Sequence, residues 1–243
     1  SKYMAFIVLK DITGKLQITV EKEDHPDLVD TIDKLTPDSV ITVTGKVMEN
    51  DYVKMGGVEM IPESIEVEST ANALPIVRKE IAATKKKKAV ERSSIDQRID
   101  YRWIDLRTDE NQLMFKAQSC FVNAMRKFLL DRNFIEIHTP KLIAAASESG
   151  SEVFKVDYFD RNAYLAQSPQ FYKQMAMAAG FERIFETGPV FRAEKSYTNK
   201  HATEFSGFDL EFSYITSFKD VMKMEEELSL IHISEPTRRS YIS

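Results

Sequence analysis

The chain has 243 residues, with 43% hydrophobic and 29% charged side chains and a formal net charge of −5. This composition is typical of a folded globular protein, and the length favours two domains. A single cysteine excludes a disulfide framework within the chain, and no apolar run approaches the ~18 residues of a membrane span. The first residues lack a signal-peptide pattern, so we expect a soluble, cytoplasmic protein without a membrane partner.

Residues 1–70 predict a small β-rich domain. A short polar helix is expected near Pro26–Lys34. Four segments rich in β-branched residues and bounded by turns predict strands: Phe6–Leu9, Leu16–Val20, Val40–Gly45 and Ile65–Glu68. Several short strands around one helix are typical of a small barrel of the OB type.

Residues 71–108 are expected to form a hinge or linker. Periodicity is lost from residue 69 to 95, a stretch that contains Pro75 and the run Lys85–Lys88. The lysine run fits either a solvated linker or a dedicated RNA contact. The second domain is expected to span residues 109–227.

The second domain mixes helices with antiparallel strands. Helices are expected at Asn111–Leu130 and from a Ser168 cap, with Pro169 in its first turn, to Gly180. The first helix has an apolar stripe, formed by Leu113, Ala117, Cys120, Phe121, Ala124 and Phe128. The predicted strands are Phe134–His138, Tyr164–Ala166, Ile184–Glu186, Val190–Glu194 and Phe208–Tyr214. The pattern is that of an α+β fold, and no glycine-rich nucleotide-binding loop is present.

A charged face is predicted where Val190–Glu194 and Phe208–Tyr214 pair as a hairpin. Strand alternation would place Arg192 beside Glu194, and Asp209 beside Glu211. An inward arginine is costly unless a ligand requires it, and its forked head suits a phosphate. The connecting loop is basic and could reach a triphosphate. A structural cluster of ion pairs is the alternative for the same pattern.

Two strings in this region resemble known proteins. Phe191-Arg192-Ala193-Glu194, followed by His201-x-x-Glu204-Phe205, resembles motif 2 of the class II aminoacyl-tRNA synthetases. The longer string from Gly188 to Glu211 resembles their aspartyl and asparaginyl branch, of the archaeal and eukaryotic type. The resemblance implies an OB-fold anticodon-binding domain without its first strand, and part of an antiparallel class II sheet flanked by helices.

The resemblance also implies an ATP site. Arg192 would be the catalytic arginine, binding the α-phosphate of ATP and contacting aspartate. Glu194, beside Ala193, would hold the adenine amino group, and Phe205 would stack on adenine. Three loop residues would lie near the terminal phosphates and the acceptor end of the tRNA: Lys200, His201 and Ala202. The implied activity is that of an aspartate–tRNA ligase, which uses ATP and Mg²⁺ to form aspartyl-adenylate and charges tRNA(Asp).

The substrate pocket and the dimer are implied in the same way. Residues 164–174 resemble the aspartate-selecting segment, with Gln170 and Lys173 on one helix face, although an ordinary solvated face would show the same spacing. Glu148, in a stretch that resembles the mobile loop over the aspartate site, would meet the substrate ammonium. Residues 121–142 resemble motif 1, which implies a homodimer with Pro140 at its interface, or otherwise an ordinary helix–strand core.

Phe6 and Gln17, eleven positions apart on adjacent predicted strands, match an aromatic and a glutamine that contact the middle anticodon base in the family. Phe6 would otherwise be a core residue. The resemblance ends near Glu227, and residues 228–243 resemble nothing in the family. Because motif 3 and the Mg²⁺-binding glutamate are not recognised, we expect no metal ligands in this chain and no activity of the chain alone. The alternatives are an asparaginyl-tRNA synthetase, which Lys173 disfavours, and a non-catalytic tRNA-binding protein.

Overall fold

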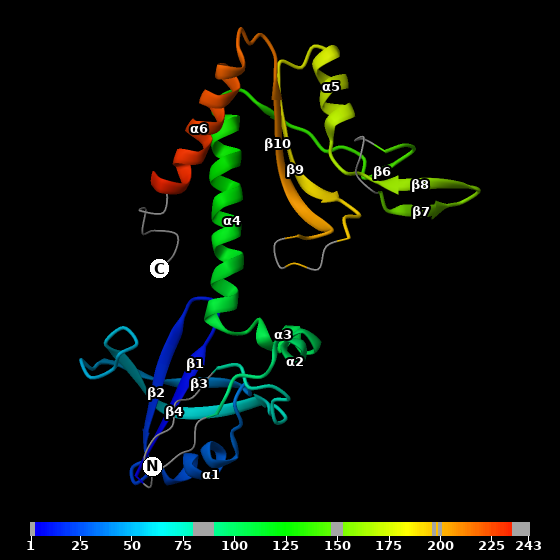
Figure 1. Cartoon of the computed structure of the whole chain (residues 1–243). Coiled ribbons are helices and arrows are strands. Elements are labelled where there is room, and N and C mark those ends of the chain that lie inside the picture. The colour runs from blue at the N-terminus through cyan, green and yellow to red at the C-terminus, as the bar shows by residue number, and fades with distance from the viewer. Residues whose placement is uncertain (1–2, 80–89, 147–152, 196–197, 199–200, 235–243) are drawn as a thin grey trace. The chain divides into compact units, whose positions relative to one another are not determined.

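The computed structural model describes residues 3–79, 90–146, 153–195, 198 and 201–234, and the chain divides into two compact units, residues 1–108 and 109–243 (Figure 1). The predicted features at Lys85–Lys88, Glu148 and Lys200 lie outside the described residues, as does the segment 235–243. None of the helices in the described part of the chain has the length and apolar character that a membrane crossing requires.

Unit 1 contains a four-stranded sheet and the helix α1, Pro26–Lys34, which has the predicted bounds. Its strand order is β1 (Met4–Lys10), β2 (Lys15–Glu21), β4 (Val58–Ser69), β3 (Val40–Glu49). The pairs β1–β2 and β3–β4 are antiparallel, whereas β2 and β4 are parallel. The four predicted strands are confirmed, each longer than expected. Within the described residues they form a sheet and not a closed barrel.

Local chemistry explains the shape of this sheet. The carboxylate of Asp11 accepts hydrogen bonds from the backbone N–H of Thr13 at 2.8 Å and of Gly14 at 3.0 Å, which closes the predicted turn between β1 and β2. Alternation buries Ile18 completely on the inner face of β2. Gly45 lies at a β-bulge in β3, where an added Cβ would be 2.8 Å from the Cα of Pro62.

Residues 71–108, predicted as a hinge or linker, belong to unit 1 and contain two short helices that the sequence did not predict, α2 (Ile95–Asp100) and α3 (Arg102–Asp105). Asp105 is fully buried and forms ion pairs with Arg102 at 2.6 Å and Arg98 at 3.5 Å. The sequence analysis did not predict these two helices because ion pairs, rather than an apolar stripe, organise this segment.

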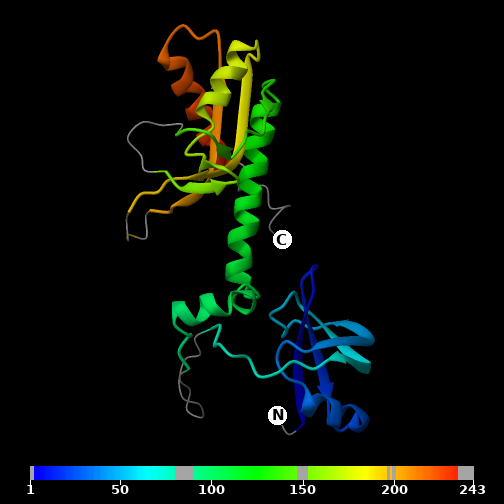
Figure 2. The same ribbon diagram turned by 90° about the vertical axis from the view of Figure 1, so that its right-hand side faces the viewer.

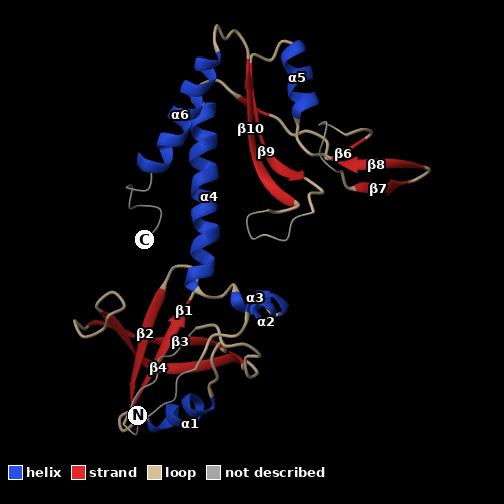
Figure 3. Cartoon of the chain, in the orientation of Figure 1, coloured by secondary structure: helices blue, strands red, loops and turns tan. Residues whose placement is uncertain are grey.

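Unit 2 contains two three-stranded sheets (Figure 3). The first has the order β10 (Glu204–Phe212), β9 (Arg183–Phe191), β5 (Ile135–Glu136). The second has the order β6 (Leu142–Ile143), β8 (Arg161–Leu165), β7 (Lys155–Tyr158). The helices are α4 (Asp109–Leu130), α5 (Gln170–Ala178) and α6 (Phe218–Ser234).

The described core of unit 2 lies on one face of the β9–β10 hairpin. Leu129, Phe134 and Phe185 are buried together, and five partly buried residues pack against them: Phe128, Phe208, Leu210, Phe212 and Met224. The end of α4 and the helix α6 therefore cover this face, and Figures 1 and 2 both show α6 beside the end of α4.

The predicted strands of unit 2 have different bounds in the structure. Ile184–Glu186 and Val190–Glu194 belong to one continuous strand, β9, which ends at Phe191. The prediction that Arg192 and Glu194 alternate along a strand is therefore wrong, because regular pairing stops where Phe191 meets Glu204. β5 is also shorter than the predicted strand, since only Ile135–Glu136 pairs with β9 in regular register.

Two helix predictions also need correction. α5 begins one residue later than expected, with Pro169 as its N-cap. Its end is as predicted: Gly180 has a φ of +90°, and the N–H groups of Gly180 and Phe181 donate to the carbonyls of Met177 and Ala176. Much of the apolar stripe of α4 is not in the core, because Leu113 is 50% exposed and Phe121 is 41% exposed.

Candidate functional site

The face of the β9–β10 hairpin opposite the core carries charged side chains and two glycines; we call it the polar face. Its members are Glu186, Gly188, Gly207, Asp209 and Glu211. In the antiparallel register Glu186 lies opposite Asp209, and Gly188 lies opposite Gly207. The predicted sharing of one face by Asp209 and Glu211, away from the aromatic residues of β10, is confirmed.

Helix α5 places Lys173 over this face. The Lys173 Nζ atom lies 3.1 Å from Asp209 Oδ1 and 3.5 Å from Glu211 Oε2, and the side chain is only 6% exposed. Both carboxylates remain about one-third exposed. The structure thus brings one buried cation and two accessible anions together, which suits a ligand carrying both charges. Gln170, one turn earlier on α5, is half-buried.

A second ion pair holds Glu186, which is 3% exposed. Its carboxylate accepts hydrogen bonds from the backbone N–H of Thr139 at 2.9 Å, the Thr139 hydroxyl at 2.7 Å and Lys141 Nζ at 2.9 Å. Burial alone would raise the pKa of Glu186, but the Thr139 hydrogen bonds and the Lys141 ammonium outweigh it and hold the pKa below its usual range. The sequence analysis did not predict this pair. A charged residue, Glu186, directly after the apolar Ile184 and Phe185 could have indicated it.

Backbone hydrogen bonds connect three predicted site segments through Lys141. The Lys141 carbonyl accepts from Ala166 N–H, and the Ala166 carbonyl accepts from Phe191 N–H, both at 2.9 Å. The segment with Pro140, the segment that leads into α5 and the end of β9 are thereby joined. Pro140 itself is exposed.

Gly188 and Gly207, which lie opposite each other, place no side chain on the polar face next to its charged residues. An added Cβ at Gly207 would lie 3.2 Å from Asp209 Oδ2. Any side chain at this position would therefore crowd the carboxylate that Lys173 holds.

Arg192 and Phe205, two of the predicted ATP-binding residues, lie together at the end of the hairpin. Arg192 N–H donates to the Thr203 carbonyl at 2.9 Å, which extends the pairing beyond β9 by one bond. The guanidinium carbon lies 5.6 Å from the centre of the Phe205 ring, within cation–π range. Phe205 is 40% exposed, so its ring remains available to a ligand.

The other predicted ATP-binding residues lie on the loop between the strands. Glu194 and Ala202 are exposed, and Ala193 is half-buried beside Arg192. His201 Nδ1 is 2.6 Å from the Thr198 hydroxyl, which fixes the imidazole at the surface. In the described ranges no group of three or more His, Cys, Asp or Glu side chains is arranged to hold a metal ion.

Phe6 and Gln17 share one face of the sheet in unit 1. Phe6 lies opposite Thr19, and Gln17 lies opposite Val8, so the two are on neighbouring cross-strand pairs. Phe6 is 61% exposed, which contradicts a core role for this ring. We call the face formed by Phe6, Val8, Gln17 and Thr19 the outer face of unit 1.

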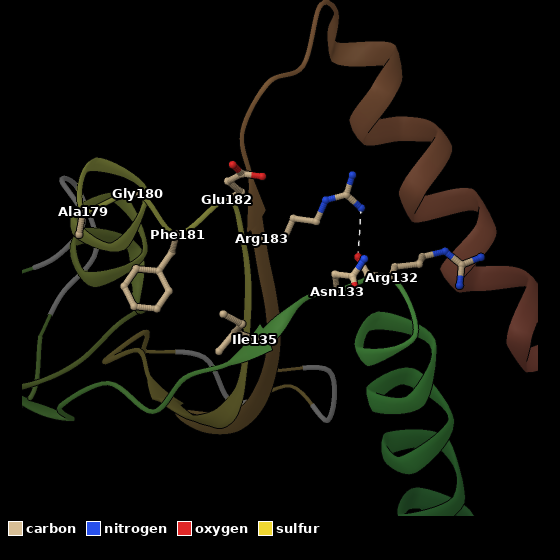
Figure 4. A pocket seen from close by; sticks show the side chains of 8 residues that line it. All are labelled: Arg132, Asn133, Ile135, Ala179, Gly180, Phe181, Glu182 and Arg183. Atoms are coloured by element: carbon tan, nitrogen blue, oxygen red, sulfur yellow. Dashed lines mark hydrogen bonds between the residues drawn. The ribbon is translucent and has the colours of Figure 1, made fainter.

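A cavity of about 580 Å³ lies at the other end of β9 and contains none of the predicted site residues (Figure 4). Its two arginines have structural partners: Arg183 donates to the Arg132 carbonyl at 3.2 Å, and Arg132 lies 3.3 Å from Glu227. We therefore place the candidate active site on the polar face and not in this cavity.

Comparison with known proteins identifies the family. Residues 94–239 match the family model described as tRNA synthetases class II (D, K and N), and residues 1–68 match the OB-fold nucleic acid binding domain. The first match extends beyond Glu227, where we placed the end of the resemblance.

Relatives in two archaea have high identity. The chain is 47% identical to the aspartate–tRNA(Asp/Asn) ligase of Methanopyrus kandleri, over 96% of this chain and 52% of that protein. It is 44% identical to the aspartate–tRNA(Asp) ligase of Picrophilus torridus, over 93% of this chain and 51% of that protein. The chain spans about half the length of the curated relatives it matches.

Solved structures are similar over nearly the whole chain. A putative aspartyl-tRNA synthetase from Leishmania major superposes with a TM-score of 0.84 at 33% identity, covering 98% of this chain and 47% of that one. The asparaginyl-tRNA synthetase of Pyrococcus horikoshii, complexed with asparaginyl-adenylate, gives 0.82 at 32% identity, covering 95% and 50%. The polar face, the OB-fold match and the family model over most of the chain lead to one conclusion: this protein belongs to the class II tRNA synthetases of the D, K and N group.

Proposed function

We propose that this chain carries ATP-, aspartate- and tRNA-binding elements of an aspartate–tRNA ligase. The observation that carries the proposal is Lys173, whose buried side chain lies against the carboxylates of Asp209 and Glu211. An ammonium at this position attracts the side-chain carboxylate of aspartate, and the two acidic residues attract the ammonium of the amino acid. Gln170 and Glu148 complete the proposed aspartate site.

In the proposed reaction an oxygen of the aspartate α-carboxylate attacks the α-phosphorus of ATP and pyrophosphate leaves. Arg192 offsets the charge that develops on the α-phosphate, and Phe205 stacks on adenine. Glu194 and Ala193 contact the adenine amino group. Lys200, His201 and Ala202 contact the terminal phosphates and the tRNA acceptor end in this proposal. Mg²⁺ bound to ATP neutralises phosphate charge when present.

The partners in this proposal are tRNA(Asp) and a second copy of the chain. Phe6 and Gln17 contact the middle anticodon base from the outer face of unit 1. The exposed apolar residues of α4 and the exposed Pro140 support a homodimer interface. The setting we propose is the cytoplasm, where protein biosynthesis takes place.

An asparaginyl-tRNA synthetase is the second candidate, supported by the similarity to the Pyrococcus horikoshii enzyme. The two candidate enzymes differ in the charge of the side chain of their amino-acid substrate. In this proposal Lys173 interacts with that side chain. A buried ammonium favours a carboxylate over a neutral amide because of the Coulomb energy in a site of low dielectric.

Calorimetric titration of the 243-residue chain with two non-hydrolysable adenylate analogues, aspartyl and asparaginyl sulfamoyl-adenosine, tests the proposal. We expect the aspartyl analogue to bind at least about tenfold more tightly, which corresponds to about 1.4 kcal/mol. Equal binding of the two analogues, or tighter binding of the asparaginyl one, would refute aspartate as the substrate. If the chain binds RNA but neither analogue, the proposed ligase function is replaced by a non-catalytic tRNA-binding role.

A further inference from the structure

Lys141 and Glu186 form an ion pair on the polar face to which the proposed reaction gives no role. Lys141 Nζ lies 2.9 Å from Glu186 Oε1, and an added Cβ at Gly188 would lie 3.5 Å from Lys141 Cε. The end of the lysine therefore lies over the backbone of Gly188, on the polar face. Glu186 lies directly opposite Asp209, whose carboxylate is 3.1 Å from the Lys173 ammonium. The ion pair is thus adjacent to the proposed aspartate site.

Hydrogen bonds hold both charges of the pair in place. Thr139 donates to the two Glu186 oxygens, through its backbone N–H at 2.9 Å and its hydroxyl at 2.7 Å. Lys141 Nζ is also 3.1 Å from the Thr139 hydroxyl oxygen. Burial would raise the pKa of Glu186, but these donors hold it below its ordinary value, so the pair consists of a carboxylate and an ammonium at neutral pH. The two side chains are only 3% and 22% exposed, so solvent and salt screen their charges weakly.

The polar face carries one more negative charge than positive charge. Its carboxylates are Glu186, Asp209 and Glu211, and the described part of the chain gives them two lysine partners, Lys141 and Lys173. Cross-strand partners have Cβ atoms about 5 Å apart, so the Glu186 carboxylate lies within about 10 Å of the Lys173 ammonium. At that distance one unit charge changes the affinity for a charged ligand by about tenfold, with an effective dielectric constant of about 20. The charge of Lys141 therefore affects which ligands Lys173 binds.

We propose that Lys141 is a specificity-determining residue: it neutralises Glu186 and so allows Lys173 to accept a ligand carboxylate rather than a neutral amide. Without Lys141, the Lys173 ammonium would face three carboxylates on this face instead of two, and their summed potential would repel a further anion. Lys141 acts through this potential and needs no contact with the substrate. The inference rests on the proposed function, in which the side-chain carboxylate of aspartate lies at Lys173.

Calorimetric titration of the 243-residue chain with the aspartyl and asparaginyl sulfamoyl-adenosine analogues tests the inference. The preference is the ratio of the two dissociation constants, in which contributions common to both ligands cancel. We expect Lys141→Met to lower the preference for the aspartyl analogue by about fivefold, because the unpaired Glu186 repels its carboxylate. The titrations are made at pH 8, where the two Thr139 hydrogen bonds keep Glu186 ionised without the lysine. An unchanged preference would overturn the inference.

The opposite charge change and the double change identify the effect as electrostatic. Glu186→Gln leaves Lys141 as an extra positive charge and should raise the preference by about two- to fivefold. Lys141→Met combined with Glu186→Gln removes both charges and should restore the preference to within about twofold of that of the unmodified chain. Loss of packing would instead reduce the preference in both single variants and reduce it further in the double variant. A double variant that keeps the full loss of Lys141→Met would contradict the role of Lys141.

Two control variants keep both charges of the pair. Lys141→Arg retains the positive charge and should retain the preference. Glu182→Gln removes an exposed carboxylate just before β9 and should leave the preference unchanged. Circular dichroism during heating shows whether each variant is folded. If Lys141→Met is not folded, because it leaves a buried carboxylate unpaired, Glu186→Gln and the double variant provide the same test, and equal preferences in these two would overturn the inference.

The unmodified chain separates this inference from the proposed function. If it binds neither analogue, or binds both equally, aspartate is not the substrate, and the proposed function fails together with the inference. If it prefers the aspartyl analogue and no variant changes that preference, the proposed function stands and only the role of Lys141 is refuted.

Discussion

Each carboxylate on the polar face lies near another carboxylate and is neutralised by a lysine. Glu186 and Asp209 lie directly opposite each other on paired strands, where like charges repel, and Glu211 is the next residue on the same face. Lys141 pairs with the first carboxylate and Lys173 pairs with the other two. Removing either lysine would leave carboxylates without a counter-charge, which costs more than the pair itself contributes.

Lys173→Met keeps the length of the side chain and removes its charge. We expect the unfolding free energy to fall by about 2–3 kcal/mol, below the full cost of a buried pair because Asp209 and Glu211 are about one-third exposed. Urea denaturation measures this, and binding of the aspartyl sulfamoyl-adenosine analogue should be lost in the same variant. The control is Lys155→Met, at an exposed position of β7. Unchanged stability and analogue binding in Lys173→Met would contradict the assignment.

Glu186 makes unit 2 sensitive to acid. Its pKa in the folded protein is below the ordinary value of 4.5, so its stabilising effect is present above that value and is lost as the pH falls through the lowered pKa. We expect the unfolding free energy of the unmodified chain to drop more steeply between about pH 5 and pH 3 than that of Glu186→Gln. Urea midpoints at several pH values measure both curves. Parallel curves would mean that the ion pair contributes no stability.

At the scale of elements, close backbone approach limits substitution in the sheet of unit 1. An added Cβ at Gly45 would meet the backbone of Ile61 and Pro62, atoms that cannot move like the end of a side chain. We expect Gly45→Ala to destabilise unit 1 by about 1–3 kcal/mol, the usual cost of overpacking.

Urea denaturation followed by circular dichroism measures the unfolding midpoint of each variant. Gly14→Ala is the matched control, because nothing lies within 4 Å of an added Cβ there. Equal midpoints for the two variants would show that the bulge at Gly45 adjusts without cost.

The elements differ in how well the sequence predicts them. α1 and α5 were predicted closely because proline near the start and Gly180 after the end are local signals. β9 was split wrongly because Thr187–Pro189 interrupts the apolar pattern, although that stretch pairs with β10 throughout. α2 and α3 were missed because ion pairs between Asp105 and the preceding Arg98 and Arg102, rather than an apolar stripe, organise them.

At the scale of the whole molecule, α4 exposes apolar side chains that a folded monomer would normally bury. Leu113, Met114 and Phe115 are each at least 50% exposed. We expect this surface to be covered in a homodimer, and Leu113→Glu to raise the dimer dissociation constant by about tenfold or more. Sedimentation velocity over a range of concentrations measures it. Phe159→Glu, at a 91% exposed position of the same unit, is the control and should leave the association unchanged.

The sequence by itself determined the family, several of the elements and the identity of the charged residues, because these depend on local spacing: the motif from Arg192 to Phe205, alternation along β10, and helix signals around α5. Only the tertiary structure decided which charged and polar side chains meet. Glu186 with Lys141, Asp209 with Lys173 and Gln17 with Glu59 lie 36 to 45 positions apart. Ion pairs and hydrogen bonds require contact within a few ångströms, and strand register and helix packing, which no local pattern specifies, create that contact.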